Sequence, residues 1–192
     1  ISSVLACAPK RNWKNNMIYI IDYGVGNLGS IANMIDYLDG QSTITNDINL
    51  IEKAEKIILP GVGAFDYGMK KLKAQNLPPV LNHLVLEKKI PVLGICLGMQ
   101  LITKKSEEGV EDGLGWIDAE TIKFPSHLRV PNMGWNYVAQ AKKSKLFNLT
   151  DEETRFYFVH SYYVKCNSSN DILFTADYEI TYTCGFEKEN IY

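Results

Sequence analysis

Residues 90–100 read Ile-Pro-Val-Leu-Gly-Ile-Cys-Leu-Gly-Met-Gln, and this stretch predicts the fold around it. Its apolar part, residues 92–95, is typical of a short buried strand, and the residues after the cysteine favour a helix. Cys96 stands at the junction, with Gly94 and Gly98 two residues away on either side. The pattern Gly-x-Cys-x-Gly is the cysteine form of the nucleophile elbow, a sharp strand-to-helix turn that exposes a reactive side chain.

Two interpretations of Cys96 are open at this point. Free cysteine is one of the most buried residue types, so Cys96 can simply belong to the core. The two glycines favour a nucleophile instead, because a residue without a Cβ lets neighbouring backbone pass close to the turn. At the N-terminus of a helix, unpaired N–H groups and the helix dipole favour the thiolate. We therefore expect a reactive Cys96 in the thiolate form.

Length and charge place the chain among ordinary globular domains. Its 192 residues can bury a sizeable core and suggest one domain. A net charge of −2 gives no electrostatic case for binding nucleic acid or an anionic membrane surface. No apolar run approaches the roughly 18 residues that a membrane span needs. The composition therefore predicts a protein that works on neither nucleic acid nor membranes.

The cysteines predict the compartment. The chain has four of them, at positions 7, 96, 166 and 184, and none has a spacing typical of metal ligands. Four are too few for a disulfide framework in a chain of this size, which favours a reducing, cytoplasmic compartment. We expect no metal site and no cofactor.

Residues 1–16 differ in character from the rest. A small apolar segment comes first and a basic, polar one follows, whereas secretion signals have the opposite order. A strongly patterned strand then begins at Met17. We expect residues 1–16 to be an extension and residues 17–192 to form the domain.

A second glycine-rich turn follows the apolar residues 18–22. Gly24, Gly26 and Gly29 spell G-x-G-x-x-G between a predicted strand and a predicted helix, and Asp47 follows at the distance of a ribose-binding acid. Taken alone, this is the dinucleotide-binding fingerprint. The pattern is weak evidence, because any tight turn that brings backbone close to another group can produce it.

A third loop, residues 60–65, reads Pro-Gly-Val-Gly-Ala-Phe and follows a predicted strand over residues 56–59. Its two glycines suggest backbone N–H groups aimed at an anion or a developing oxyanion. An ordinary glycine-rich loop is the alternative. Helices are predicted over residues 65–75 and 80–89, with a break at residues 76–79.

The pattern changes after residue 115. Short strand-like runs, separated by turns, predict an antiparallel second half. These runs cover residues 121–124, 136–138, 155–159 and 172–175, and residues 131–136 read as an exposed loop carrying Trp135. We expect a three-layer α/β fold with a parallel sheet in the first half and a mixed one in the second. Cys96 should lie at the carboxyl edge near the centre of the sheet, where such folds bind ligands.

Five segments together carry a resemblance to a known family. Residues 94–100 resemble the nucleophile motif of class I (triad) glutamine amidotransferases. Four further segments, in this order along the chain, resemble the glutaminase subunits of imidazole glycerol phosphate synthases. They are residues 22–28, 60–65, 133–136 and 157–162. The resemblance runs from Met17 to the end and implies a flavodoxin-like, three-layer fold.

The resemblance implies a mechanism. Cys96 would attack the side-chain amide of L-glutamine, giving a thioester and ammonia. Backbone N–H groups near Val62 and Gly63, with that of Leu97, would hold the oxyanion. The implied glutamine contacts are Gly61, Gly63, Gln100, His160, Ser161 and Tyr162.

The resemblance also implies a partner. Ammonia would pass to a (β/α)₈-barrel cyclase that makes imidazole glycerol phosphate in histidine biosynthesis, the two chains forming a heterodimer. Residues near this partner would be Asp22, Asn27, Trp135 and Asn136. On this interpretation the G-x-G-x-x-G match does not indicate nicotinamide binding.

Two departures from the family pattern leave alternatives open. The family carries its triad histidine and glutamate in a His-Pro-Glu motif, which residues 1–192 do not contain. His160 matches a different segment of the family, so it is not expected to be the triad histidine. We therefore expect a C-terminally truncated domain. Asn132 stands where many relatives have histidine. The alternatives are a paralogue that supplies ammonia in surface-sugar or lipopolysaccharide biosynthesis, and a non-catalytic glutamine- or partner-binding module.

Overall fold

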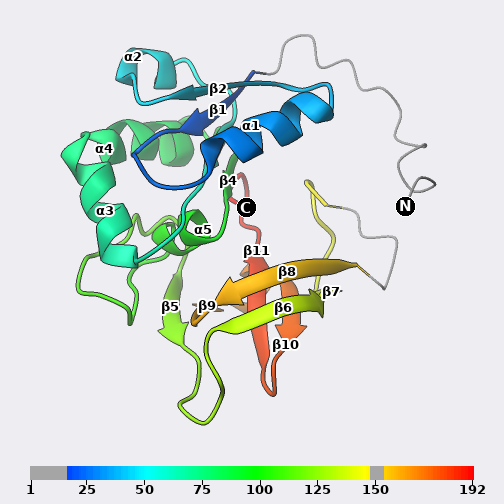
Figure 1. Ribbon diagram of the computed structural model, residues 1–192. Helices are drawn as coiled ribbons and strands as arrows, with labels where there is room; N and C mark the ends of the chain where they lie inside the picture. The colour runs from blue at the N-terminus through cyan, green and yellow to red at the C-terminus, as the bar shows by residue number, and fades with distance from the viewer. Residues whose placement is uncertain (1–16, 148–153) are drawn as a thin grey trace.

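The computed structural model describes residues 17–147 and 154–192, which form two regions (Figure 1). One region holds a parallel sheet flanked by helices, and the other holds antiparallel strands. The predicted α/β class, parallel in its first half, is confirmed. The proposed extension over residues 1–16, with Cys7, lies outside the described residues.

The parallel sheet has the strand order β2-β1-β3-β4. Its strands are β1 (Met17–Ile21), β2 (Gln41–Thr45), β3 (Ile57–Leu59) and β4 (Val92–Gly94). All three residues of β3 are buried, as expected for a parallel strand covered on both faces. The carboxyl ends of β1, β3 and β4 therefore lie side by side, and each leads into one of the three glycine-rich loops.

Helices connect these strands. They are α1 (Leu28–Tyr37), α2 (Ile48–Ile51), α3 (Phe65–Ala74), α4 (Leu77–Asn82), which continues as a π-helix over His83–Glu87, and α5 (Leu97–Leu101). The predicted break between two helices is present but shorter than residues 76–79, because α3 ends at Ala74 and α4 already begins at Leu77. Pro78 and Pro79 lie in its first turn, where a helix needs no N–H hydrogen bond. No described helix is long and apolar enough to cross a membrane.

Asp47 has a structural role that the dinucleotide fingerprint did not predict. Its carboxylate accepts a hydrogen bond from the backbone N–H of Asn49 at 2.9 Å and caps the start of α2. A capping carboxylate already has its hydrogen-bonding partner in the helix. Asp47, the acid at the predicted ribose-binding position, therefore has a structural role as the cap of α2.

The antiparallel strands form sheets of their own. The larger sheet has the order β5-β9-β11-β10-β7, and β6 pairs with β8 in a separate two-stranded sheet. The strands are β5 (Ala119–Lys123), β6 (Asn132–Tyr137), β7 (Ala139–Gln140), β8 (Arg155–His160), β9 (Tyr162–Cys166), β10 (Ile172–Asp177) and β11 (Thr181–Phe186), with a 3₁₀ turn over Ser169–Asp171. The loop expected over residues 131–136 is thus mostly strand β6. It is ordered by its antiparallel register with β8, a long-range pairing that the local pattern does not reveal.

Residues 190–192 pair with β4 on the side away from β3. Ile191 forms a parallel bridge with Val92, and the N–H of Gly94 donates to the carbonyl of Tyr192 at 2.8 Å. Strand β4 therefore has backbone neighbours on both sides. Cys96 follows this strand, at the carboxyl edge of the sheet and away from its margin.

Candidate active site

The elbow at Cys96 has the backbone geometry that the sequence predicted. Strand β4 ends at Gly94 and α5 begins at Leu97, so Cys96 is the residue at the turn. Its φ of 54° and ψ of −113° lie in a region that residues with a side chain rarely adopt. Such a conformation costs about 1–3 kcal/mol and persists only where the surrounding structure holds it.

The two flanking glycines are required by close backbone contacts. A Cβ on Gly94 would lie 2.7 Å from the Cα of Met99, in the first turn of α5. A Cβ on Gly98 would lie 1.8 Å from the carbonyl oxygen of Leu59, at the end of β3. Only glycine lets α5 approach the sheet this closely, as the sequence pattern indicated.

The loop after β3 packs directly against the elbow. A Cβ on Gly61 would lie 2.9 Å from the Cβ of Leu97, and the Tyr23 hydroxyl donates to the carbonyl of Pro60 at 2.5 Å. Within the described residues, no hydrogen bond occupies the backbone N–H of Gly61, Val62 or Gly63. The loop with these free N–H groups therefore lies against Leu97, the residue that follows Cys96.

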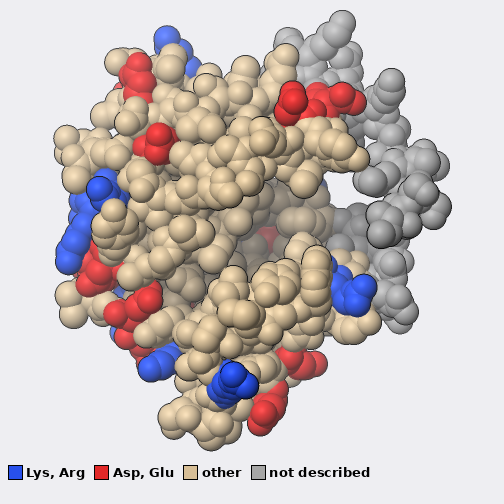
Figure 2. Space-filling model, in the orientation of Figure 1, with Lys and Arg blue, Asp and Glu red and all other residues tan. Residues whose placement is uncertain are grey.

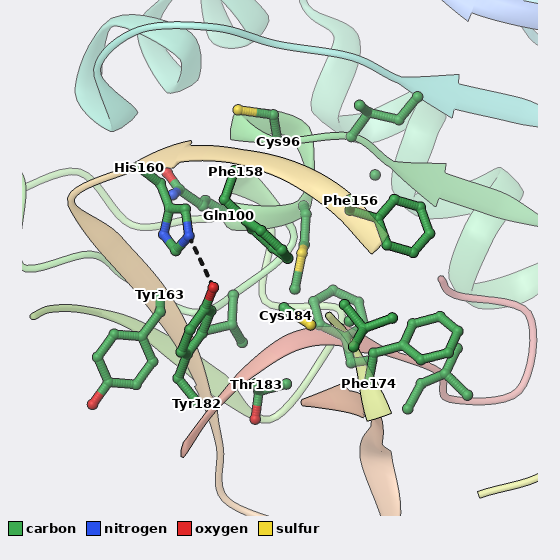
Figure 3. A pocket seen from close by; sticks show the side chains of 18 of the residues that line it. Cys96, Gln100, Phe156, Phe158, His160, Tyr163, Phe174, Tyr182, Thr183 and Cys184 are labelled. Atoms are coloured by element: carbon green, nitrogen blue, oxygen red, sulfur yellow. Dashed lines mark hydrogen bonds between the residues drawn. The ribbon is translucent and has the colours of Figure 1, made fainter. Parts of the chain in front are cut away.

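A pocket of about 450 Å³ lies between the parallel sheet and the antiparallel strands. Figure 2 shows a hollow here, with charged side chains mostly at its periphery. Four of the predicted site residues line the pocket, and they are Cys96, Gln100, His160 and Tyr162. Much of the remaining wall is aromatic, including Phe156, Phe158, Tyr163, Phe174 and Tyr182 (Figure 3). These aromatic residues were not singled out from the sequence, because nothing local in it shows that β8, β10 and β11 face the elbow.

The other predicted site residues do not line this pocket. Val62 and Gly63 are exposed in the loop beside the elbow, and Ser161 forms the turn between β8 and β9. The carbonyl of Ser161 accepts a hydrogen bond from the N–H of Phe124 at 3.2 Å. Its side chain makes no hydrogen bond within the described residues, so its hydroxyl is available to a ligand.

His160 is held by hydrogen bonds at both ring nitrogens. Its Nδ1 lies 2.8 Å from the carbonyl of Tyr162, so this nitrogen carries the proton that is donated. Its Nε2 then accepts from the Tyr182 hydroxyl at 3.4 Å, and the Asn132 amide lies 3.5 Å away. Burial lowers the pKa of His160. The ring is thus a neutral group that holds the turn at Ser161. Tyr182 and Asn132 support the ring, a role that the sequence did not predict for them.

The expected thiolate form of Cys96 is not supported. Burial raises the pKa of the thiol, and a hydrogen bond from the N–H of Leu97 only partly offsets this. Helix α5 has only five residues, so the stabilisation that its dipole can give a thiolate is small. The residue as a whole nevertheless remains accessible to solvent at the turn, although neighbouring atoms shield part of the thiol. Cys96 is therefore accessible but needs a base to become a strong nucleophile.

The pH dependence of alkylation tests this. Iodoacetamide reacts with the thiolate, so with a raised pKa the labelling rate of Cys96 should rise about tenfold per pH unit from pH 6 to pH 8. Cys166 and Cys184 should label more slowly, because burial raises their pKa values to about 11 and about 12. Peptide mass spectrometry measures each site. A rate that is flat between pH 6 and pH 8 would show that a base such as His160 already holds Cys96 as thiolate.

The residues expected near a partner occupy different positions. Asp22 accepts from the N–H of Gly24 at 3.0 Å, and Asn27 caps α1 by accepting from Ser30 at 3.2 Å. Trp135 is 69% exposed on the outer face of β6. The neighbouring Asn136 points the other way, and its amide donates to the carbonyl of Asp177 at 2.6 Å.

A cysteine on a strained elbow beside free backbone donors defines an α/β enzyme with a cysteine nucleophile. The protein-family model "Glutamine amidotransferase class-I" matches residues 19–191. The chain belongs to the class I glutamine amidotransferase family.

Named relatives and a solved structure are consistent with this family. Imidazole glycerol phosphate synthase subunit HisH 2 of Methanococcus maripaludis is 53% identical over 178 residues, covering 92% of this chain and 88% of the relative. Subunit HisH of Leptospira interrogans is 44% identical over 181 residues, covering 92% and 89%. The crystal structure of a glutamine amidotransferase from Thermotoga maritima has a TM-score of 0.65 at 18% identity, covering 92% of this chain and 73% of that one, and shows the shared fold.

Proposed function

We propose that the chain is the glutaminase subunit of an imidazole glycerol phosphate synthase. It hydrolyses L-glutamine to glutamate and ammonia, and it passes the ammonia to a (β/α)₈-barrel cyclase for histidine biosynthesis. The observation that carries the proposal is the exposed Cys96 on its elbow, beside the free N–H groups of the loop after β3. Identity of up to 53% to HisH subunits over most of the chain supports the reaction assigned to it.

The reaction begins when the sulfur of Cys96 attacks the amide carbon of glutamine. A carbon–sulfur bond forms, and the π electrons of the carbonyl move onto oxygen. We expect the N–H of Leu97 and those of Val62 and Gly63 to hold this oxyanion. The thiol proton passes through a general base to the amide nitrogen, so that collapse expels ammonia and leaves a thioester, which water hydrolyses to glutamate with return of the thiol.

Glutamine binds in the part of the pocket next to the elbow. Gln100 and Tyr162 line it, and the free hydroxyl of Ser161 lies at the adjacent turn. Gly61 contributes backbone beside Leu97, with no side chain in the way. His160 acts behind these groups, because its Nδ1 holds the carbonyl of Tyr162.

We do not assign the general base to His160. Both of its nitrogens are engaged with groups other than Cys96, and burial favours its neutral form. The parallel pairing of residues 190–192 with β4 directs any continuation of the chain toward Cys96. A His-Pro-Glu motif in such a continuation would bring its histidine to the thiol. General acid–base catalysis of this kind contributes a factor of roughly 10² to 10⁴.

The cyclase docks on the outer face of the β6–β8 sheet. Residues directly opposite in the register share a face, and here the outer pairs are Met133 with Val159 and Trp135 with Tyr157. All four side chains are at least half exposed. Large aromatic residues on an exposed apolar patch, with few charges, are typical of a protein interface.

Trp135 should dominate binding of this partner. Its ring lies 5.7 Å from that of Tyr157 in an edge-on contact, so the two rings form one aromatic patch on this face. Trp135→Asp is expected to weaken binding to the barrel by at least about 2 kcal/mol, because central tryptophans are typical hot spots. Isothermal titration calorimetry measures this. Tyr67→Asp, at an exposed aromatic residue of α3, is the matched control and should bind as the wild type does.

Reconstitution tests the proposed function. The full-length protein is mixed with the barrel cyclase of the same organism, and formation of imidazole glycerol phosphate is followed with glutamine or with ammonium salt as the nitrogen source. Glutamine-dependent product formation is the expected result. Glutamate release without this product, or release only with a surface-sugar barrel, would identify the surface-sugar paralogue. Absence of glutamate release with either barrel would indicate a non-catalytic module.

A further inference from the structure

We infer that Asn190 is a positioning residue for the general base of the reaction. Its side chain sets the register of residues 190–192 on β4, and this register fixes where the following residues of the strand lie relative to Cys96. The inference rests on the proposed function, because it takes the base to come after residue 192 in a His-Pro-Glu motif.

The side chain of Asn190 joins the end of a helix to the entry of β4. The residue is 8% exposed, and its amide nitrogen donates to the carbonyl of Ile90 at 2.8 Å and to that of Val85 at 3.0 Å. Val85 lies in the last turn of the π-helix, where carbonyls have no partner within the helix. Ile90 lies two residues before β4. One buried amide thus serves two acceptors that lie 100 and 105 positions earlier in the chain.

The two acceptors leave one orientation for the Asn190 amide. Both are carbonyl oxygens, so the NH₂ group must face them and the Oδ1 atom must face away. Within the described residues this buried oxygen has no hydrogen-bond partner, which is unfavourable and is offset by the two bonds that the nitrogen donates. An apolar residue at this position would instead leave both carbonyls unpaired.

The backbone of the same segment pairs with β4. The N–H of Val92 donates to the carbonyl of Asn190 at 2.9 Å, and the N–H of Gly94 donates to that of Tyr192 at 2.8 Å. Backbone pairing offers the same groups at every register, because each residue carries one N–H and one C=O. The contacts of the Asn190 amide are specific to the observed register, so they select it.

An ion pair beside Asn190 is the competing source of this register. Glu189 pairs with Lys89 at 2.8 Å, in the turn that leads into β4. Both side chains are more than half exposed, and exposed ion pairs contribute little to stability. The buried amide is therefore expected to dominate.

A change of register would displace the base by a distance that matters for the reaction. A strand advances about 3.3 Å per residue and successive side chains point to opposite faces, so a slip of one residue would move the histidine and turn it away from the thiol. A misplacement of about 1 Å can already cost roughly 10²-fold in rate. The proposed glutamine contacts lie on other elements, so substrate binding should not depend on Asn190.

Kinetics of the full-length protein in complex with the barrel cyclase test the inference. Asn190→Ala is expected to lower kcat for glutamate release by roughly 10- to 100-fold, with KM nearly unchanged. Asn190→Ser keeps one donor on a shorter side chain, and its kcat should lie between those of the wild type and Asn190→Ala. Glu189→Gln removes the competing ion pair and should leave both parameters within about twofold of the wild type.

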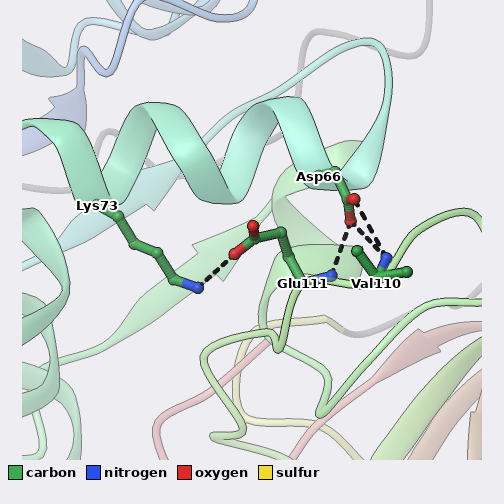
Figure 4. Close-up of polar contacts among 4 residues, drawn as sticks. All are labelled: Asp66, Lys73, Val110 and Glu111. Carbon is green, nitrogen blue, oxygen red and sulfur yellow. Dashed lines mark hydrogen bonds and ion pairs between the residues drawn. The ribbon is translucent and has the colours of Figure 1, made fainter.

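Asn82→Ala is the matched control for the loss of a long-range amide contact. Asn82 ends α4, and its side-chain oxygen accepts from the indole N–H of Trp116 at 2.6 Å. This variant should lower the urea midpoint, as Asn190→Ala does, and leave kcat within about twofold of the wild type. Lys73→Met is a second control away from β4, since it removes the ion pair with Glu111 that joins α3 to the loop after α5 (Figure 4).

Hydrogen exchange provides a measurement that does not depend on turnover. The amides of Val92 and Gly94 donate to residues 190–192, whereas the amide of Ile95 donates to the carbonyl at the end of β3. In Asn190→Ala the first two amides should exchange at least about tenfold faster than in the wild type, and the amide of Ile95 should change little.

Two results would overturn the inference. One is an equal effect on kcat in Asn190→Ala and Asn82→Ala, which would reduce Asn190 to a stabilising residue. The other is unchanged exchange of the two β4 amides in Asn190→Ala, which would show that the register does not depend on the side chain. Failure of the proposed function would instead show as glutamate release that survives Cys96→Ala.

Discussion

Cys96→Ala is expected to reduce glutamate release by a factor of roughly 10⁶, because loss of a nucleophile removes the covalent route and leaves its base without a partner. The fold should survive, because the Cys96 side chain is exposed and alanine meets the same backbone restriction at a φ of 54°. Glutamate released from the complex with the barrel cyclase is measured in a coupled assay. Product formation from ammonium salt should remain at the wild-type rate, since the cyclase no longer needs the glutaminase.

Cys166→Ala is the matched control for this experiment. Cys166 is a free cysteine of intermediate exposure on β9, and it does not line the pocket. Its replacement should leave glutamate release within about twofold of the wild type, as expected for a change away from the reacting atoms. Activity lost in Cys166→Ala and kept in Cys96→Ala would place the nucleophile elsewhere.

Gly98→Ala is expected to destabilise the fold by about 3 kcal/mol or more, at the upper end of the range for overpacking. The added methyl group would stand 1.8 Å from the carbonyl oxygen of Leu59. The methyl carbon is fixed directly to the Cα and the carbonyl belongs to the backbone, so no change of side-chain rotamer relieves the contact, and α5 must move away from β3. Urea unfolding, followed by circular dichroism, measures the loss. Glutaminase activity should fall with it, because the same movement displaces Cys96.

Gly29→Ala provides the control for adding a methyl group. Gly29 lies in α1, and nothing lies within 4 Å of where its Cβ would be. Alanine in a helix interior is more favourable than glycine by up to about 1 kcal/mol, so this variant should be as stable as the wild type or more so. Equal stabilities of Gly98→Ala and Gly29→Ala would contradict the close packing of the elbow against β3.

The contacts that place the nucleophile are also contacts of the core. Gly98 lies against the end of β3, and Gly61 lies against Leu97, so the elbow, the loop after β3 and the sheet form one packed unit. A strained residue such as Cys96 needs this support from its surroundings. Substitutions at Gly61 and Gly98 should therefore lower activity and stability together. Cys96→Ala should lower activity and leave stability nearly unchanged.

The sequence by itself determined the elements that depend on local sterics. The elbow at Cys96 and helix α3, predicted to begin at residue 65, are both present. In each case the deciding factor lies within a few residues. Glycine permits close backbone approach, and the period of the apolar residues separates strand from helix. The resemblance in five segments likewise needed only their order along the chain.

Tertiary structure alone decided the features that depend on distant groups. The pairing of β6 with β8 turned an expected loop into a strand that presents Trp135. The hydrogen bond from Phe65 to Glu108 spans 43 positions, and the pKa of Cys96 is raised by burial, against the expectation from its helix. Strand pairing and desolvation depend on which segments are close in space, and a local sequence pattern does not show this.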